Sequence, residues 1–384
     1  MKMNTFMTAA AGMVLAFALT ACGGGGAGST TDPTTSAGMD SSSASAPAGE
    51  AGGSVGVSMP TQTTERWIAD GEAVKSQLEE AGFEVDLQFA NDDIPTQSQQ
   101  IDQMITQGAK VLIIAAIDGT ALAPQLENAA AQGIKIISYD RLIRDSENVD
   151  FYVSFDNFKV GVAQGQSLID GLAARGEGPF NVELFAGSLD DNNAHFFFSG
   201  AMSVIQPKID DGTFTVVSGQ TDIEQAATLG WQQETAQKRM EDLLTANYQD
   251  KKVDGVLSAN DGLARGIITA LQNNGYSGTV ADTFPIITGQ DAEIASTKLI
   301  QDGIQYSTIF KDTRLLAEQA VTAAQDLLAG EEPEANNTED YDNGVKVVPS
   351  YLLDVVTVTQ ENLTEALVDT GYWTQEEIDA GVIS

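Results

Sequence analysis

The stretch KVLIIAAIDGTALAPQLENAAAQGIKIIS, residues 110–138, indicates the fold of this chain. It begins with the apolar run 110–115 and ends with a second apolar run, 134–138, and apolar residues recur at helical spacing in 121–132 between them. Continuous apolar runs are typical of parallel strands covered on both faces, and Gly133 stands where a helix commonly ends. The stretch therefore predicts two parallel strands joined by a helix through a right-handed crossover.

Strand and helix patterns alternate on both sides of this unit. Toward the N-terminus, strands are expected at 54–58 and 84–89, and helices at 64–81 and 94–107. Beyond the unit, further strands are expected at 151–155, 180–185, 213–217, 253–257 and 285–288. The helices that accompany them are expected at 160–173, 194–209, 234–247 and 263–273. Repeated strand–helix units of this kind predict an α/β fold with parallel sheets.

The length of the chain indicates two lobes. About 330 residues follow residue 53, which is more than one hydrophobic core usually holds. We expect two Rossmann-like lobes joined by a hinge of several strands. The N-terminal lobe is expected to contain residues 54–156 and 292–338, and the C-terminal lobe residues 157–291 and 339–384. The chain is expected to cross between the lobes near Asp156, near Asp291 and within residues 337–343.

The first 53 residues are not expected to belong to this fold. Lys2 precedes an apolar run that is too short to span a bilayer, so residues 1–21 are expected to form a secretory signal peptide. The run ends in LTAC, which resembles the bacterial lipobox, and the resemblance implies that Cys22 carries a lipid. The alternative is an unmodified cysteine in a cleaved peptide. Residues 22–53 are mostly Gly, Ser, Thr, Ala and Pro, so a flexible linker is expected behind the lipidated cysteine.

These features predict an extracytoplasmic protein held on the outer face of the cell membrane by lipidated Cys22. The chain has no other cysteine, so no internal disulfide is expected. After residue 55, no apolar stretch approaches the length of a membrane-spanning helix. The lipid is therefore the only membrane contact that the sequence predicts.

The charge of the chain excludes one class of partner. Acidic residues outnumber basic ones by 55 to 19, which gives a formal net charge of −36. Binding to nucleic acid needs clustered Lys and Arg at the phosphates, so no nucleic-acid partner is expected. The acidic residues are scattered along the chain, which predicts a strongly solvated folded surface.

Polar and aromatic side chains follow most of the expected strands. Ligands of open α/β sheets bind beyond the carboxyl ends of the strands, so these side chains are candidate binding residues. They are Arg66, Trp67, Asp140, Arg141, Asn193, Asn260, Asp291 and Lys311, with Trp231 close by in the expected layout.

These residue types suit a sugar. Carboxylates, amides and guanidinium groups can each engage two neighbouring hydroxyls, and an indole ring can stack on the C–H face of a pyranose. Other interpretations stay open for single residues. An Asp or Asn after a strand can be a helix N-cap, with Asp261 the strongest case. Asp140 and Arg141 could form a local salt bridge, and Trp231 could be a core residue.

The sequence disfavours two common kinds of catalytic site. The chain has one histidine, His195, and neither HExxH nor paired cysteines, which disfavours a histidine-based triad or a zinc site. A glycosidase with a carboxylate pair stays open, because Glu183 and the pair Asp190 and Asp191 are present. We expect a protein that is not an enzyme, with no metal and no cofactor.

A series of motifs resembles the periplasmic sugar-binding receptors of ABC importers, in their multiple-sugar and xylose-binding branch. The resemblance implies the type I periplasmic binding protein fold. The motifs are ERW (65–67), QSQQIDQMITQGAKVLIIAAIDG (97–119), SYDRLI (138–143), VSFDNFKVG (153–161), DDNNA (190–194), SGQ (218–220), GQDAE (289–293), YSTIFKDT (306–313) and NGVKVVPSYLL (343–353).

The resemblance also implies roles for the candidate residues. Those that would hydrogen-bond the sugar are Arg66, Asp140, Arg141, Asn193, Asp291 and Lys311. Trp231 would stack an indole on the ring, and Asn260 matches an asparagine of the xylose-binding branch. Within the repeated asparagines, Asn193 is expected to face the sugar and Asn192 is not.

The function implied by the resemblance is binding of xylose, glucose or a related aldose between the two lobes. A monomer would then deliver the sugar to the membrane permease of an ABC transporter. The alternative is a sugar receptor that signals to a sensor kinase or chemoreceptor. A transcription regulator of the same fold is disfavoured by the export signal and the acidic surface.

Overall fold

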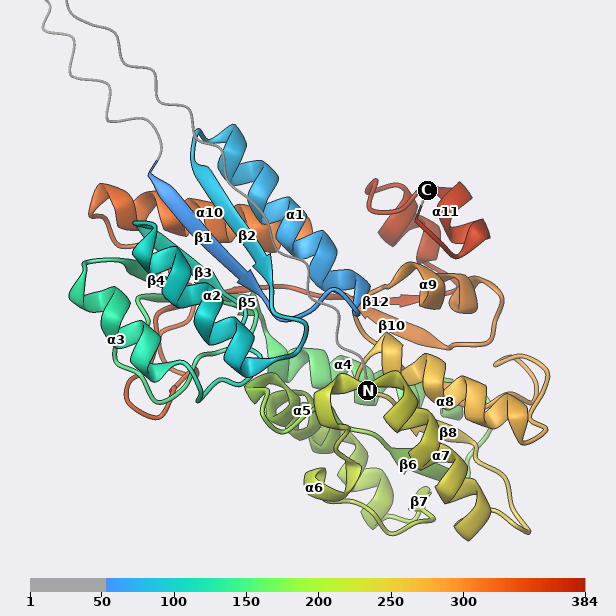
Figure 1. The fold of residues 1–384 in the computed structure, drawn as a ribbon. Helices are drawn as coiled ribbons and strands as arrows, with labels where there is room; N and C mark the ends of the chain where they lie inside the picture. Colours follow the sequence, from blue (N-terminus) through green and yellow to red (C-terminus); the bar gives the residue numbers. More distant parts are fainter. Residues whose placement is uncertain (1–52, 384) are drawn as a thin grey trace, which may run out of the picture. The chain divides into compact units, whose positions relative to one another are not determined.

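A six-stranded parallel sheet forms the first lobe, in the strand order β11-β5-β4-β3-β1-β2 (Figure 1). The computed structural model describes residues 53–383. The strands are β1 (Ser54–Met59), β2 (Glu84–Phe89), β3 (Val111–Ile114), β4 (Lys135–Tyr139), β5 (Phe151–Phe155) and β11 (Ser350–Leu353). The register pairs Val57 with Ile113 and Ile113 with Ile137, so the carboxyl ends of the central strands meet at one edge of the sheet.

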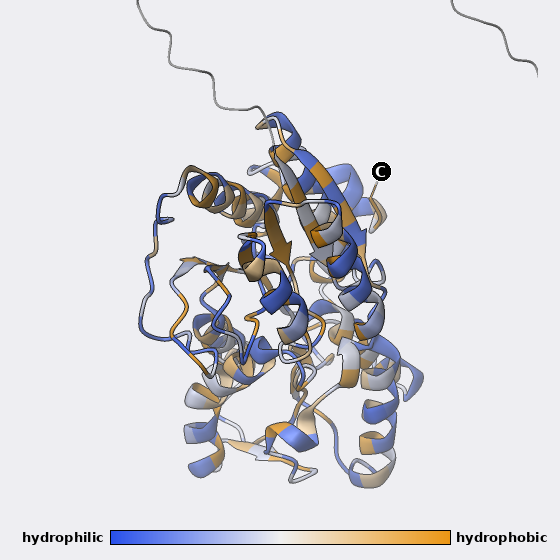
Figure 2. Ribbon diagram, turned by 60° about the vertical axis from the view of Figure 1, so that its left-hand side comes forward, coloured by the Kyte–Doolittle hydropathy of each residue, from blue (hydrophilic) through white to orange (hydrophobic). Residues whose placement is uncertain are grey.

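Helices cover both faces of this sheet. They are α1 (Glu65–Glu80), α2 (Ile94–Thr106), α3 (Ala123–Ala131) and α10 (Thr313–Ala329). Within β3, Ile113 packs on the face shared with α1 and α10, whereas Leu112 and Ile114 pack on the face shared with α2 and α3. Burial on both faces explains why β3 is apolar at every position. Hydrophilic residues lie mainly on the outer sides of the helices (Figure 2).

A four-stranded parallel sheet forms the core of the second lobe, in the order β7-β6-β8-β9. Its strands are β6 (Phe180–Leu184), β7 (Phe214–Val216), β8 (Gly255–Leu257) and β9 (Ile286–Ile287). Its helices are α4 (Asn157–Ala173), α5 (Asn192–Asp210), α6 (Ile223–Ala226), α7 (Gln233–Asn247) and α8 (Asp261–Asn273), with a 3₁₀ turn at Leu229–Trp231.

The packing of α4 on α5 depends on glycine. A Cβ added to Gly161 would lie 2.0 Å from the carbonyl oxygen of Phe197, and one added to Gly200 would lie 2.2 Å from that of Phe158. The two helix backbones can approach this closely only without side chains at these positions. This contact fixes α5, whose first turn carries Asn193.

A third group of elements follows β9. It contains α9 (Ile294–Gln301), β10 (Ser307–Phe310), β12 (Val356–Thr359), a π-helical turn at Thr364–Val368 and α11 (Gln375–Ala380). β10 pairs antiparallel with β12, and Ile309 forms a parallel bridge with Gln290 just beyond β9. This group therefore extends the second lobe.

The expected α/β architecture with parallel sheets is confirmed, but two segments lie in the other lobe. Residues 292–309, expected in the first lobe, supply β10, which pairs with β12. Residues 350–353, expected in the second lobe, form β11, which pairs with β5 in the first. The chain crosses between β5 and α4, then between β10 and α10, and finally between β11 and β12. The second and third crossings therefore lie after the positions expected for them, near Asp291 and within residues 337–343. The apolar pattern of a strand does not show which strand it pairs with. The sequence pattern alone therefore could not assign these two segments to the correct lobe.

The signal peptide expected at residues 1–21, the lipidation expected at Cys22 and nearly all of the expected linker lie outside the described residues. Among residues 53–383, no helix combines the length and apolar character that crossing a membrane requires.

Candidate ligand-binding site

A cavity lies where the carboxyl ends of strands from both lobes meet, and the space free of atoms there, including the part open to solvent, is about 460 Å³. All nine residues chosen from the sequence line it: Arg66, Trp67, Asp140, Arg141, Asn193, Trp231, Asn260, Asp291 and Lys311. The lining also includes residues that the sequence interpretation did not choose: Thr61, Thr64, Asp92, Asp191, Phe197, Gly230 and Gln290. The expected clustering is therefore present, and the roles of the residues toward a ligand stay predictions.

Arg66, in the first turn of α1, is the central cation of the first lobe. Its Nη2 lies 2.5 Å from Asp140 Oδ2, and its Nε donates to Asp70 Oδ2 at 2.8 Å. Its Nη1 lies 3.6 Å from Asp291 Oδ1 in the second lobe. Burial alone would lower the pKa of Arg66, but the three carboxylates outweigh it and raise the pKa well above its ordinary value. Arg66 therefore stays charged, and three carboxylates fix the orientation of its guanidinium group.

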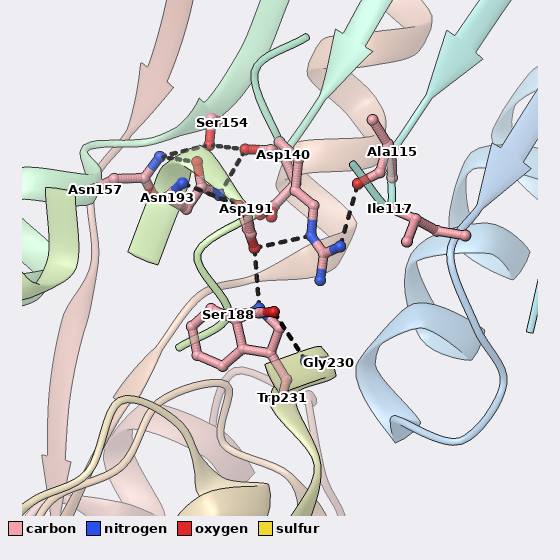
Figure 3. A network of polar contacts seen from close by, with 12 residues as sticks. Ala115, Ile117, Asp140, Ser154, Asn157, Ser188, Asp191, Asn193, Gly230 and Trp231 are labelled. Carbon is pink, nitrogen blue, oxygen red and sulfur yellow. Dashed lines mark hydrogen bonds and ion pairs between the residues drawn. The ribbon is translucent and has the colours of Figure 1, made fainter. Parts of the chain in front are cut away.

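Asp140 directly follows β4 and has a left-handed backbone, with φ of 57°. Its carbonyl oxygen accepts hydrogen bonds from the Ser154 hydroxyl (2.8 Å) and from Asn193 Nδ2 (2.9 Å) (Figure 3). The same oxygen accepts from the Tyr152 hydroxyl at 2.6 Å. Burial alone would raise the pKa of Asp140, but Arg66, Lys311 and Arg141 outweigh it and keep the pKa below its ordinary value. The carboxylate is therefore charged, and its uncommon backbone conformation is held by neighbouring groups.

Asp191 joins the two lobes. Its Oδ2 lies 3.0 Å from Arg141 Nε in the first lobe and accepts from the indole Nε1 of Trp231 at 3.2 Å in the second (Figure 3). Burial raises the pKa of Asp191, against the opposing effect of Arg141. Arg141 also donates to the Ala116 carbonyl at 3.1 Å, and its guanidinium carbon lies 5.0 Å from the centre of the Trp67 ring.

The indole of Trp231 is held against the backbone of the second lobe. A Cβ added to Gly187 would lie 2.1 Å from the Trp231 ring, so only glycine leaves room for it. Phe197 meets the ring edge-on, with centroids 6.3 Å apart. Trp231 has a left-handed φ of 55° and follows Gly230, which has a φ of 61°. The ring is therefore positioned rigidly at the cavity wall, where it can stack on an apolar ligand face.

The hinge side of the cavity carries a buried ion pair. Lys311, just after β10, has its Nζ 2.9 Å from Asp291 Oδ1, and its side chain is almost fully buried. Asp291 has a left-handed backbone, with φ of 98°. The neighbouring Gln290 is also buried, and its Oε1 has no hydrogen-bond partner in the described part of the chain. A buried acceptor without a donor is costly, so Gln290 offers a place for a ligand hydroxyl.

Two open questions from the sequence are answered at the start of α8. Asn260 is the N-cap of this helix, since its Oδ1 accepts from Leu263 N at 2.9 Å, and it also lines the cavity. Asp261, expected as the cap, is instead fully buried and accepts from the Glu293 amide at 3.0 Å and from Gln305 Nε2 at 2.7 Å. The expectation for Asp261 was wrong because its side chain binds the segment after β9, which lies far away in the sequence.

The two neighbouring asparagines lie in different surroundings. Asn193 lines the cavity, whereas Asn192 accepts from Arg144 Nη1 at 2.7 Å and borders a separate cavity. Glu183 does not line the central cavity; its carboxylate accepts from the Ser218 and Tyr248 hydroxyls at 2.6 and 2.7 Å. The carboxylate pair considered for a glycosidase is therefore not assembled among the lining residues.

Comparison with known proteins identifies the family. A family model described as a periplasmic binding protein domain matches residues 55–332. The chain belongs to the periplasmic binding protein family. Among its relatives is the multiple sugar-binding periplasmic receptor ChvE of Rhizobium radiobacter, which is 54% identical over 327 residues, covering 85% of this chain and 92% of that protein.

Two further periplasmic binding proteins are informative. The D-xylose-binding periplasmic protein of Escherichia coli is 39% identical, over 84% of this chain and 92% of that protein. An ABC transporter solute-binding protein from Clostridium phytofermentans, solved with bound β-D-glucose, is 44% identical, with a TM-score of 0.81 over 85% of this chain and all of that chain.

The family assignment confirms three expectations. The resemblance to sugar receptors and the two-lobed type I architecture are both shown. The relatives are binding proteins without catalytic activity, so this periplasmic binding protein is not an enzyme.

Proposed function

We propose that this chain is an extracytoplasmic receptor that binds one monosaccharide, glucose, xylose or a related aldose, between its lobes. The observation that carries the proposal is the network through which both lobes present charged groups to one cavity: Arg66 and Asp140 from the first, Asp291 and Lys311 from the second. The proteins most informative for the ligand are the relatives named for xylose and multiple sugars and the one solved with glucose.

The charges of the lining favour a neutral sugar over a charged ligand. Three cationic groups are interleaved with four carboxylates, those of Asp92, Asp140, Asp191 and Asp291, so no single sign dominates. Each fixed charge can donate to or accept from a sugar hydroxyl without being released from its own partner. Trp231 supplies the apolar surface that the C–H face of a pyranose requires.

Selectivity follows from burial. When the lobes enclose the ligand, a lining group that lacks a matching hydroxyl stays unpaired, and a site built to hydrogen-bond a hydroxyl discriminates strongly against an analogue without it. Gln290 is such a group.

A thermal-shift screen of aldoses on sugar-free protein tests the proposal. The chain from residue 53 onward, unfolded, dialysed and refolded, is expected to gain thermal stability with D-glucose, D-xylose or a close epimer, and not with mannitol or glycerol at the same concentration. The proposal fails if no aldose in the panel raises the melting temperature.

We further propose that Cys22 is lipidated and that the sugar is delivered to the permease of an ABC transporter. The support is the LTAC sequence and the description of the glucose-bound relative as an ABC transporter solute-binding protein. A Cys22→Ser variant is expected to leave the membrane fraction, and a retained membrane association contradicts the lipid anchor. A sugar-dependent pull-down of a permease, and not of a sensor protein, distinguishes transport from signalling.

A further inference from the structure

The turn that carries Asp291 is held at every backbone amide. Residues 291–294 lead from β9 into α9, and each of their four N–H groups donates to a different partner. The acceptors are, in order, the Ile309 carbonyl at 2.9 Å, Thr308 Oγ1 at 3.1 Å, Asp261 Oδ2 at 3.0 Å and Glu65 Oε1 at 3.1 Å. The last of these acceptors belongs to the first lobe.

This turn has an unfavourable backbone. Asp291 and Ala292 have φ values of 98° and 50°, and neither is glycine. Such a conformation persists only when surrounding groups over-determine it, and it is common at ligand sites. The direction of the Asp291 carboxylate, toward Lys311 at 2.9 Å and Arg66 at 3.6 Å, depends on this conformation.

The C-terminal segment supplies one more constraint. The indole Nε1 of Trp373 donates to the carbonyl oxygen of Ala292 at 2.8 Å, and the only other donor to this oxygen among the described residues is the Thr297 hydroxyl at 3.3 Å. Trp373 is itself fixed by the ring of Tyr372, 5.0 Å away and nearly perpendicular, and Tyr372 packs in the same way on Phe310. The helix that follows, α11, lies beside α9 (Figure 1).

We propose that Trp373 is a positioning residue for the ligand site. It does not line the cavity, and it lies beyond residues 55–332, which carry the family match. It acts through the Ala292 carbonyl: the hydrogen bond fixes the Ala292–Glu293 peptide, which helps to hold Asp291 and Ala292 in their left-handed conformation and thereby aims the Asp291 carboxylate at the ligand. The inference rests on the proposed sugar-binding function.

Trp373→Phe tests this role, because it keeps a ring in the aromatic cluster and removes the N–H donor. Calorimetric titration with D-glucose and D-xylose is expected to show a dissociation constant five- to tenfold higher than that of the wild-type chain. The matched control is Thr374→Ala, at the next residue. Thr374 is the N-cap of α11, so its loss weakens the same C-terminal segment but leaves the indole hydrogen bond in place. Thr374→Ala is expected to lower the melting temperature and keep the dissociation constant within twofold.

The possible results distinguish a failure of the role of Trp373 from a failure of the proposed function. An unchanged dissociation constant in Trp373→Phe, or an equal rise in Thr374→Ala, overturns the role of Trp373 and leaves the proposed function standing. A wild-type chain that binds neither sugar contradicts the proposed function and this inference with it.

If the Trp373→Phe variant does not fold, a second measurement, on the wild-type chain, tests the same role of Trp373. Coupling between two sites is reciprocal, so sugar binding must strengthen the bond to Ala292. Hydrogen exchange of the Trp373 indole N–H in the wild-type chain is expected to slow when sugar is added, by a larger factor than exchange of the Ile378 amide in α11. The chain has three tryptophans, so the signal is assigned through Trp67→Phe and Trp231→Phe. Equal slowing at both positions contradicts the proposal.

Discussion

The Arg141 guanidinium of the first lobe lies 3.0 Å from the Asp191 carboxylate of the second. The same carboxylate accepts a hydrogen bond from the Trp231 indole, so one buried anion connects a cation of one lobe to the aromatic ring of the other. A ligand in the cavity would meet all three groups at once. The contact therefore joins the two lobes through groups that also line the cavity.

Asp191→Asn is expected to raise the dissociation constant for the sugar at least tenfold, or about 1.4 kcal/mol. The amide keeps the shape of the side chain and can still accept from Trp231, but it no longer pairs with the charge of Arg141. Isothermal titration calorimetry measures the change. Asp190→Asn is the matched control, because Asp190 borders the separate cavity and not the central one. Equal sugar affinities in the two variants would show that the ion pair between Arg141 and Asp191 does not contribute to sugar binding.

Gly187→Ala is expected to weaken sugar binding without removing any polar group of the site. The added methyl would lie 2.1 Å from the Trp231 ring and must displace it, at a cost of about 1–3 kcal/mol in the free energy of unfolding. Gly262→Ala serves as control, since its added carbon meets its nearest neighbour at an ordinary 3.6 Å. Titration and chemical unfolding of both variants check the prediction. If the Gly187→Ala protein binds the sugar with wild-type affinity, sugar binding does not require the Trp231 indole in this position.

The buried carboxyl group of Asp70 is expected to make the free energy of unfolding depend on pH. Burial raises the pKa of Asp70 to about 6, although the charge of Arg66 opposes it. The folded protein therefore binds this proton more tightly than the unfolded chain, whose ordinary pKa is 3.8. As the pH falls through about 6 toward 4, Asp70 adds stability, and this gain is absent at neutral pH.

The comparison with Asp70→Asn isolates this effect, because the other carboxylates titrate in both proteins. The free energy of unfolding of the wild-type chain, measured in urea, is expected to rise relative to that of the variant between pH 7 and pH 5. A difference between the two proteins that stays constant over this range would contradict the assignment.

Much of the site could be predicted because its residues follow strands. β2 and β5 have the bounds that the apolar pattern predicted, and Asp140, Asn260, Asp291 and Lys311 stand directly or almost directly behind strands whose carboxyl ends meet. Asp92 and Gln290 also follow strands, so the same signal was available for them. Asp191 also follows an expected strand and stood in a quoted motif, but it was not chosen as a binding residue.

The remaining features depend on contacts between distant segments. The apolar run of β10 has the same appearance whether it belongs to the sheet of the first lobe or pairs with β12, so its lobe was assigned wrongly. Asp70 lies inside a helix, and only the fold shows that it supports Arg66 and accepts from the Tyr139 hydroxyl at 2.5 Å. Trp373 lies 81 residues from the carbonyl that it binds, and no local pattern connects the two.

Calorimetric titration of sugar-free protein with D-glucose and D-xylose, beside the same titration of Asp140→Ala, tests the central claim most directly. The Asp140 carboxylate lies 2.5 Å from Arg66 Nη2 and accepts from Asn193 Nδ2 at 3.2 Å, so the variant removes this acceptor from the middle of the network. The backbone carbonyl that the Tyr152 and Ser154 hydroxyls hold is still present in the variant. The account predicts saturable binding of one sugar molecule per wild-type chain and at least a hundredfold loss of affinity in the variant. Absence of heat from both sugars with the wild-type chain, or equal binding by the two proteins, would contradict it.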